Sequence, residues 1–591
     1  MEINTEITAP THALSGVDIQ SAKIDRPSYQ CYESSFTLPD SDRSYPEGLY
    51  LHTSKPDGNG GFVPVNLWLA SPMRLVGKTS DENGSSFGFL IEVKDGHGNW
   101  VKSVVRKRWL TNGGAEFLGA LYDLGVSIDL DHKSKLVAWI SKATHDLHYT
   151  VTSRCGWFGD AFITPGTTIG NPRIIYSPSS PVNGFVTQGG LSSWTEATRL
   201  ARNNDAFSLA LCYGFAGPLM KLAGIQGGGF HLFGDSSKGK SVITSFVSSI
   251  WGDASHLVKS WAASRTGLEL YAHAVNETCV FLDELNNANP ENVGDVVYML
   301  GNGGGSVKGT RDRKLAAPLH WRTPVISNGE RSVPDFLRMH KKHVNTGQIG
   351  RLVDVSCDFT HGAFNDLNGF NSLPEFIDLL MSTAEDHHGL AGIEFVKRIS
   401  EQEGLGALIK GSMNDLTKHF PCETNIQFRG SRLFMLAVVA GYLASAFGII
   451  QLTPDEILTS IKRAFVRWSK TFATNKDETT QILENIDAFV MAHGNTRFSE
   501  LHPNDEDLIR DRAGWYKTTV SGKNEPVRTW IFLTAGLVEA SGGQGLDRIL
   551  KALTDAKWLQ INASGKSSKP TKVLGGLKRL YWVLIPDEFG E

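Results

Sequence analysis

Alternating hydrophobic and polar positions dominate residues 50–105, and this alternation predicts β-strands. It covers the stretches 64–70, 86–94 and 99–105, and the last two flank a Gly-containing turn typical of a hairpin. Two helical and two further strand-like segments follow, at 115–124, 132–141, 149–153 and 159–164. We therefore expect an α+β domain over residues 46–192, preceded by a polar lead-in at 1–45.

The pattern changes after a stretch rich in Gly and Ser at 184–193. Short apolar runs now end in polar residues, and segments with helical spacing separate them. The four runs lie at 230–233, 279–282, 323–328 and 351–356. The run at 279–282 has no polar residue, which indicates a parallel strand that is buried on both faces. Strands alternating with helices predict a doubly wound α/β core, expected at 193–372, whose ligand lies outside the carboxyl ends of the strands.

Helical spacing dominates the region 373–475, which predicts a helical lid packed on this core. Its segments lie at 376–401, 429–447 and 454–471. The most apolar stretch, 433–450, contains two glycines and a serine and lies close behind two arginines. We therefore expect a buried helix there rather than a membrane span.

The last region, 476–591, has the closing order of a winged helix-turn-helix, which is a helix, a strand, a basic loop and a strand. Five cations lie in or beside its final loop: Lys566, Lys569, Lys572, Lys578 and Arg579. They fit a wing that contacts DNA phosphates. A merely solvated hairpin is the other interpretation.

Composition narrows the class of protein only slightly. The 591 residues are 41% hydrophobic and 20% charged with a net charge of −4, so any contact with nucleic acid must be local. The six cysteines stand singly, which favours a reducing compartment over a zinc ribbon. The amino terminus lacks a basic region followed by an apolar stretch, so we expect a cytoplasmic location without membrane association.

One motif carries specific chemistry. The pattern GxxxxGK[ST] lies between a predicted strand and a predicted helix, the context that a phosphate-binding loop requires. Its residues are Gly234, Asp235, Ser236, Ser237, Lys238, Gly239, Lys240 and Ser241. Backbone N–H groups of such a loop can surround the phosphates of ATP. Lys240 would contact the outer phosphates, and the Ser241 hydroxyl would bind Mg²⁺.

Hydrolysis also needs a metal ligand, a general base and a group that orients water. Asp283 and Glu284 end the second apolar run, so we expect Asp283 to hold Mg²⁺ and Glu284 to act as the base. An ordinary strand exit is the alternative for this acidic pair. Asn328, at the end of the third run, fits a residue that orients the attacking water, and a turn residue is its alternative.

Arginines supply the remaining positive charge that transition-state stabilisation requires. Arg351 fits an arginine finger that reaches the γ-phosphate of an adjacent subunit, and a surface ion pair with Asp354 is the alternative. Arg429 and Arg432, near the start of a lid helix, are weaker candidates for a second sensor, with a helix-flanking charge as the alternative.

The segment between the acids and Asn328 is longer than a minimal connection. Glycines at 303–305 precede four cations, Lys308, Arg311, Arg313 and Lys314, which suggests a β-hairpin with a basic tip. In a ring such hairpins would converge on the axis and follow a nucleic-acid backbone. A solvated loop is the alternative.

Together these motifs resemble the P-loop domain of self-loading replicative helicases from bacterial mobile elements and prophages, which are related to the MCM helicases of the AAA+ class. The likeness rests on Gly234-Asp-Ser-Ser-Lys-Gly-Lys-Ser241, Phe281-Leu-Asp-Glu-Leu285, Ile326-Ser-Asn-Gly-Glu330 and Gly347-Gln-Ile-Gly-Arg351-Leu-Val-Asp354. Stretches 66–72, 156–163 and 545–553 extend it from about Tyr50 to Ile585. Many relatives carry Thr in place of Asn328.

The resemblance implies a hexameric, ATP-driven DNA helicase with pore hairpins and with Arg351 acting in trans. Two other functions use the same nucleotide site and stay open. One is an ATP-gated origin-binding initiator without processive unwinding, and the other is a remodelling or defence ATPase that does not act on DNA. No fused primase or zinc module is implied.

Overall fold

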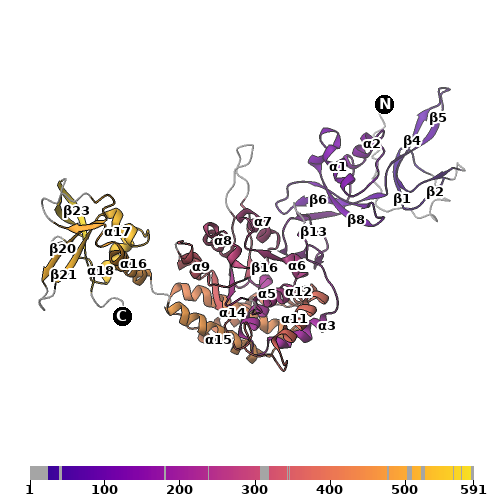
Figure 1. Cartoon of the computed structure of the whole chain (residues 1–591). Helices are drawn as coiled ribbons and strands as arrows, with labels where there is room; N and C mark the ends of the chain where they lie inside the picture. The colour runs from indigo at the N-terminus through magenta and orange to yellow at the C-terminus, as the bar shows by residue number, and fades with distance from the viewer. Residues whose placement is uncertain are drawn as a thin grey trace.

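The computed structural model describes residues 24–38, 43–178, 182–236, 238–305, 318–342, 344, 346–474, 478–501, 509–520, 526–562, 565–573 and 576–586. It contains three folded parts (Figure 1). A central α/β domain lies between an N-terminal domain rich in strands and a smaller C-terminal domain.

The N-terminal domain contains two main sheets. The first has the order β1-β4-β5, and the second has the order β13-β9-β6-β7-β8. They contain the strands expected at 64–70 and 149–153 and the hairpin expected at 86–105. Helices α1 and α2 pack on them through Phe117, Leu136 and Trp139. The elements are β1 (Ser28–Tyr32), β2 (Phe36–Thr37), β3 (Ser44–Tyr45), β4 (Gly48–Pro56), β5 (Phe62–Ala70), β6 (Met73–Asp81), β7 (Gly88–Lys94), β8 (Trp100–Arg106), α1 (Ala115–Asp123), α2 (Lys133–Ser141), β9 (His148–Thr152) and β13 (Ile174–Tyr176).

The lead-in expected at residues 1–45 differs from the structure in its second half. Residues 28–32 form β1, which pairs antiparallel with β4. Cys31 is buried in the domain core, and Tyr32 stacks on Phe36 with ring centroids 3.6 Å apart. The strand is too short to alternate clearly in sequence, and its partner lies about twenty residues downstream, so local pattern does not identify it.

A small sheet of β10 (Gly156–Phe158), β11 (Ala161–Thr164) and β12 (Thr167–Ile169) attaches this domain to the centre. The Cys155 N–H donates to the Ala274 carbonyl at 2.9 Å, and the Asn276 side chain donates to the Cys155 carbonyl at 2.8 Å. The Trp157 N–H donates to the Glu277 carboxylate at 2.7 Å. One backbone–backbone and two backbone–side-chain hydrogen bonds thus connect the two domains.

The central sheet has five parallel strands in the order β15-β16-β17-β14-β18, as strands that alternate with helices predict. Its strands are β14 (Gly227–Phe233), β15 (Val258–Ser260), β16 (Val280–Asp283), β17 (Thr323–Gly329) and β18 (Leu352–Ser356). Its helices are α3 (Leu191–Ala197), α4 (Asp205–Gly214), α5 (Lys240–Ser248), α6 (Ala254–Leu257), α7 (Arg265–Ala274), α8 (Pro290–Asn302), α9 (Val333–Met339) and α10 (Thr346–Ile349). Helix α4 ends at Gly214, because Gly214, Gly217 and Pro218 disfavour continuation of a helix.

The helices after β18 share one apolar core with this sheet. Phe230 of β14 contacts both Tyr213 of α4 and Phe434 of α14, with ring centroids 4.8 Å apart in each pair. The helices are α11 (Leu373–Asp386), α12 (Leu390–Ser400), α13 (Leu405–Leu416), α14 (Asn425–Ala446) and α15 (Pro454–Thr474). The apolar stretch at 433–450 lies mostly within α14 and is buried, as expected. Among the described residues, none of the helices is long and apolar enough to cross a membrane.

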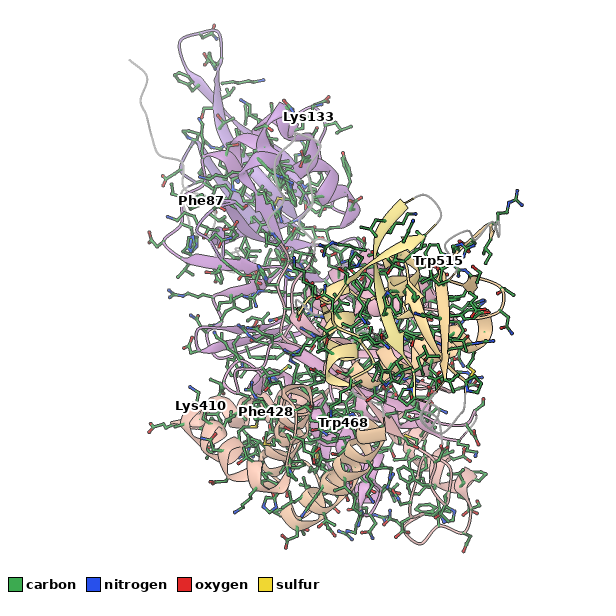
Figure 2. All side chains as sticks on the ribbon, turned by 90° about the vertical axis from the view of Figure 1, so that its left-hand side faces the viewer. Phe87, Lys133, Lys410, Phe428, Trp468 and Trp515 are labelled. Atoms are coloured by element: carbon green, nitrogen blue, oxygen red, sulfur yellow. The ribbon has the colours of Figure 1, made fainter. Side chains whose placement is uncertain are left out.

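The C-terminal domain packs three helices against a sheet of order β19-β20-β21-β23-β22, which also contains Trp515 (Figure 2). The elements are α16 (Glu478–His493), β19 (Phe498–Glu500), β20 (Gly514–Val520), β21 (Pro526–Phe532), α17 (Thr534–Ala540), α18 (Leu546–Asp555), β22 (Lys569–Val573) and β23 (Gly576–Leu584). The helix, strand and strand that end the chain follow the expected order. Four of the five expected wing cations are exposed, whereas Lys569 donates to Gln560 and lies over the Trp582 ring.

Candidate nucleotide site

The phosphate-loop motif occupies the turn from β14 into α5, at the carboxyl edge of the sheet. Gly234 has φ 154° and Gly239 has φ 100°, a conformation that favours glycine. A Cβ on Gly239 would lie 2.5 Å from the Phe364 ring. No side chain caps the start of α5, so its first N–H groups can bind an anion. Ser237 lies outside the described residues.

Lys240 is buried at the start of α5, and its ammonium group points back into the loop. It donates to the carbonyls of Gly234 at 2.9 Å and Asp235 at 2.5 Å. A buried ammonium that binds only neutral carbonyls is poorly compensated. Phosphate oxygens at this position would supply the negative charge that these contacts lack. Lys238, in contrast, is exposed and paired with Asp235, and this pairing lowers the pKa of Asp235.

The two expected magnesium ligands lie next to each other. The Ser241 hydroxyl donates to a carboxylate oxygen of Asp283 at 3.1 Å, although the two residues are 42 positions apart. Asp283 ends β16, and Ser241 is the second residue of α5. A hydroxyl and a carboxylate are oxygen ligands of the kind that Mg²⁺ prefers. This donor set therefore fits the expected metal.

Glu284 leaves the strand with an unusual backbone conformation. Its φ of 58° is in the left-handed region, which is costly for a residue with a side chain and concentrates at functional sites. Its side chain accepts the Asn286 N–H at 3.3 Å and is not tied to a cation among the described residues. Because the backbone turns at Glu284, this residue does not continue the strand that Asp283 ends. The Glu284 carboxylate is therefore available as a base.

Asn328 is buried and connects three elements of the site. Its side-chain oxygen accepts the Glu284 N–H at 3.1 Å, and its amide nitrogen donates to the Thr244 hydroxyl of α5 at 3.0 Å. Asn328 therefore holds the strained backbone of Glu284 against the phosphate-loop helix. Its predicted role in orienting water remains a prediction.

The segment after β18 braces the loop from outside. The Ala363 N–H donates to the Lys238 carbonyl at 2.7 Å, and Phe364 packs against Gly239. The same segment is fixed to α4, because Asn204 accepts the N–H groups of Asn365 and Asp366 at 2.7 and 2.9 Å. Neither contact is signalled by the motif itself.

Sequence reasoning missed a pair of arginines on α15. Arg463 and Arg467 both bind the buried carboxylate of Asp205, at 2.7 and 3.1 Å. The Arg467 guanidinium also lies 4.4 Å from the centre of the Phe359 ring, in the bracing segment. Burial raises the pKa of Cys357 to about 12, and the charges of Lys240 and Arg467 both oppose that shift. The spacing of two arginines one helical turn apart was the available signal.

Arg351 lies at the other edge of the sheet. Its carbonyl accepts the Gly229 N–H at 2.8 Å, at the beginning of β14. At roughly 3.3 Å per residue, the strand places it roughly 15–20 Å from the phosphate loop of the same chain. Its side chain donates to Asn302 at 2.8 Å and to the Gly347 carbonyl at 2.6 Å, and it stacks on Tyr298. Arg351 therefore cannot reach the nucleotide of its own chain.

The alternative of an Arg351–Asp354 ion pair is not observed. Asp354 instead accepts the Val333 N–H at 2.8 Å. Arg432 donates to the Ala223 carbonyl at 2.6 Å, and the charge of Arg429 lowers the pKa of Arg351 after the larger effect of burial. Both candidates for a second sensor thus lie at the Arg351 edge, far from the phosphate loop of their own chain. Arg467 instead contacts Phe359, which lies in the segment that braces that loop.

The basic tip expected on the hairpin, with Lys308, Arg311, Arg313 and Lys314, lies outside the described residues. The base of this segment is described. Gly304 pairs antiparallel with His320, and the Gly305 N–H donates to the Leu319 carbonyl at 2.9 Å. The two arms therefore begin as a hairpin does.

His231 is a buried histidine of β14, three residues before Gly234 of the phosphate loop. The His231 ring accepts from Ser327 at 2.8 Å and donates to the Arg331 carbonyl at 2.9 Å, the direction that a carbonyl partner requires. Trp261 donates to the same Ser327 hydroxyl at 2.8 Å. Burial lowers the pKa of His231 to about 4, so the ring is neutral near pH 7.

This histidine makes stability depend on pH. Because the folded-state pKa is below the unfolded value of about 6.5, unfolding takes up a proton between these values, and stability is lost as pH falls from 6.5 towards 4. At pH 5 the loss attributable to His231 is roughly 2 kcal/mol. We expect His231→Gln to reduce the drop in melting temperature between pH 7 and pH 5. An equal drop in the variant and the parent protein would contradict this assignment.

Comparisons with known proteins add a likeness of fold. Residues 43–318, which include the phosphate loop, Asp283 and Glu284, match a family model described as a domain of unknown function, DUF927. No curated protein matches the chain. A solved structure titled "SCCmec type IV Cch - active helicase" is similar with a TM-score of 0.65 and 15% identity, over 91% of this chain and 96% of that one.

Two structures of the NrS-1 C-terminal region also match, over 77% and 86% of this chain and 95% and 96% of those chains. Their TM-scores are 0.30 and 0.31 with identities of 9% and 10%, too low to support an argument. The chain therefore has the fold of the structure titled as an active helicase, and the chemistry must be argued from its own residues.

Proposed function

We propose that the chain is an ATP-driven DNA helicase that assembles as a ring, expected to be a hexamer, and acts in replication initiation of a mobile element or prophage. The observation that carries this proposal is the contact between Ser241 and Asp283, with Lys240 and Glu284 beside it. The likeness of fold to a structure titled as an active helicase supports it.

In this proposal the residues divide the work of ATP hydrolysis. Lys240 and the N–H groups at the start of α5 bind the phosphates, while Ser241 and Asp283 hold Mg²⁺. When bound, Mg²⁺ would supply positive charge against the phosphate oxygens. Glu284 accepts a proton from the attacking water, and Asn328 fixes the backbone from which Glu284 acts.

A neighbouring copy completes the site. Arg351 lies too far from its own phosphate loop, and Asn302, Gly347 and Tyr298 hold its guanidinium at the opposite edge of the sheet. In a head-to-tail ring each such edge meets the next phosphate loop, because heterologous contacts close into rings. Arg429 would lie at the same interface.

Strand separation is assigned to the hairpin that starts at Gly303. We expect Lys308→Ala/Arg311→Ala/Arg313→Ala to abolish unwinding of a forked duplex, because the backbone of the translocated strand loses its cationic contacts. ATP hydrolysis without DNA should continue. The assay is displacement of a labelled strand, with Lys397→Ala/Lys410→Ala/Lys418→Ala as a matched control. Undiminished displacement by the hairpin variant would contradict the pore assignment.

The same assays separate the two other functions. Specific DNA binding and slow ATP turnover without strand displacement would favour the origin-binding initiator, with the exposed cations beside β22 and β23 as its contact surface. ATP hydrolysis that does not respond to single-stranded DNA would favour a remodelling ATPase.

A further inference from the structure

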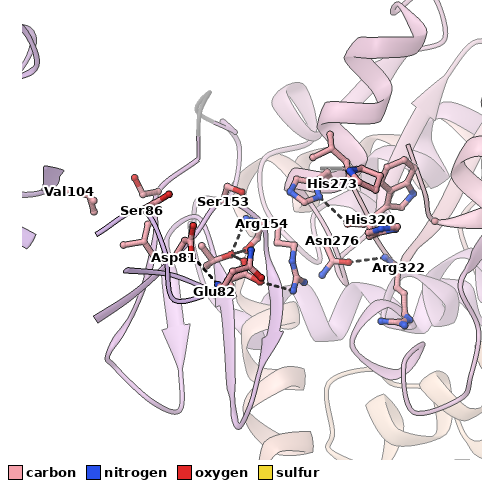
Figure 3. A pocket seen from close by; sticks show the side chains of 18 of the residues that line it. Asp81, Glu82, Ser86, Val104, Ser153, Arg154, His273, Asn276, His320 and Arg322 are labelled. Carbon is pink, nitrogen blue, oxygen red and sulfur yellow. Dashed lines mark hydrogen bonds and ion pairs between the residues drawn. The ribbon is translucent and has the colours of Figure 1, made fainter. Parts of the chain in front are cut away.

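A cavity of about 820 Å³ lies between the N-terminal domain and the central domain. Asp81, Glu82 and Arg154 form one wall, and Asn276, His320 and Arg322 form the facing wall (Figure 3). We propose that this cavity binds a segment of single-stranded DNA through its phosphates. The proposal rests on the proposed function, because it takes DNA as the partner and adds where the strand lies.

The charges that line the cavity favour an anion. Its two carboxylates are already occupied, since Asp81 accepts three hydrogen bonds from its own turn, and Glu82 binds Thr152 at 2.6 Å and Arg154 at 3.1 Å. Arg106 and Arg322 also line the cavity. Neither has a carboxylate within 4.0 Å among the described residues. Two guanidinium groups without an ion-pair partner among the described residues therefore line the same space from different domains. Burial raises the pKa of the nearby Glu277 carboxyl, and the charge of Arg322 opposes that shift.

A neutral donor in the same lining also lacks a partner. The Trp321 side chain is 3% exposed, and its buried Nε1 has no acceptor in the described part of the chain. Buried donors of this kind normally find an acceptor. Phosphodiester oxygens are acceptors only, so they fit the two arginines. The Trp321 N–H is closed to solvent, so a phosphate would reach it only after the lining shifts.

The position of the cavity favours a strand over a small anion. Gly303 and the residues from Pro318 to Arg322 line it, so it opens at the base of the hairpin. Small-molecule sites are lined mainly by apolar side chains, whereas this lining is rich in charged and amide groups. A cationic groove that follows a backbone is typical of single-strand binding.

The cavity also reaches the side chain that holds Arg351, the residue assigned to the neighbouring active site. Asn302 lines the cavity, and its side-chain oxygen accepts from Arg351 at 2.8 Å. A strand that enters the cavity would therefore act on the residue that positions the arginine. DNA bound in the cavity would therefore change the rate of ATP hydrolysis through Asn302 and Arg351.

The test measures the affinity of the full chain for a fluorescent oligothymidylate by anisotropy over a series of salt concentrations. We expect Arg106→Ala/Arg322→Ala to weaken binding by at least about 10-fold at moderate salt. The slope of log Kd against log salt should fall by roughly 1.4, which is 0.7 for each lost phosphate contact on a single strand. The control is Lys133→Ala/Lys410→Ala, whose exposed lysines on α2 and α13 do not line the cavity (Figure 2).

Arg106→Lys/Arg322→Lys retains both charges and is expected to retain the salt slope, which separates loss of charge from misfolding. Binding by the alanine variant with the affinity and slope of the parent protein would overturn the cavity assignment while leaving the proposed function intact. A parent protein that does not bind the oligonucleotide at all would overturn both.

Discussion

Glu284→Gln is expected to lower ATP hydrolysis by at least about 100-fold, the usual effect of removing a general base. The amide cannot accept the proton of the attacking water, whereas the phosphate loop, Lys240 and the Ser241–Asp283 pair are unchanged. Nucleotide should therefore still bind. The measurements are phosphate release and the affinity for a non-hydrolysable ATP analogue.

Glu291→Gln is the matched control, because Glu291 is a carboxylate on the nearby helix α8 that pairs with Lys342 outside the site. It should hydrolyse ATP at the parent rate. Hydrolysis by Glu284→Gln within a few-fold of the parent rate would assign the base to another residue and leave the left-handed backbone at Glu284 without a catalytic reason.

Arg351→Ala is expected to lower the rate of hydrolysis by about 10³-fold, the lower end of the range for an arginine finger. The loss should appear in kcat, since the guanidinium acts on charge that develops in the transition state. The phosphate loop of the same chain lies at the other edge of the sheet, so its own nucleotide contacts should persist. Steady-state kinetics with ATP provide the measurement.

The exposed Arg338 of α9, which is paired with Asp335, supplies the control. Arg338→Ala should retain the parent kcat. If Arg351→Ala instead raises KM and leaves kcat unchanged, Arg351 contributes only to binding, and the finger role is excluded.

The site residues that directly follow a strand could be predicted from the sequence. Residues at the carboxyl ends of parallel strands meet at one edge of the sheet, so the apolar runs before Gly234, Asp283 and Asn328 were enough to bring these residues together. The same logic places Arg351, which precedes its strand, at the opposite edge.

Contacts between distant elements could not be predicted in this way. Arg467 meets Asp205 only because α15 packs on α4, and the two residues are 262 positions apart in the sequence. The bridging role of Asn328 depends on the proximity of Thr244, 84 positions upstream. Such contacts arise from tertiary packing, and a local spacing such as that of Arg463 and Arg467 does not identify the distant partner.

Mixing two inactive variants tests most directly whether the active site is shared between copies. Lys240→Ala chains lack the phosphate contact but retain Arg351, and Arg351→Ala chains have the reverse defect. Each should be inactive alone. Their mixture should recover part of the hydrolysis, because an intact phosphate loop meets an intact Arg351 at some interfaces. A mixture that remains as inactive as its separate components would contradict a site completed by a neighbouring chain.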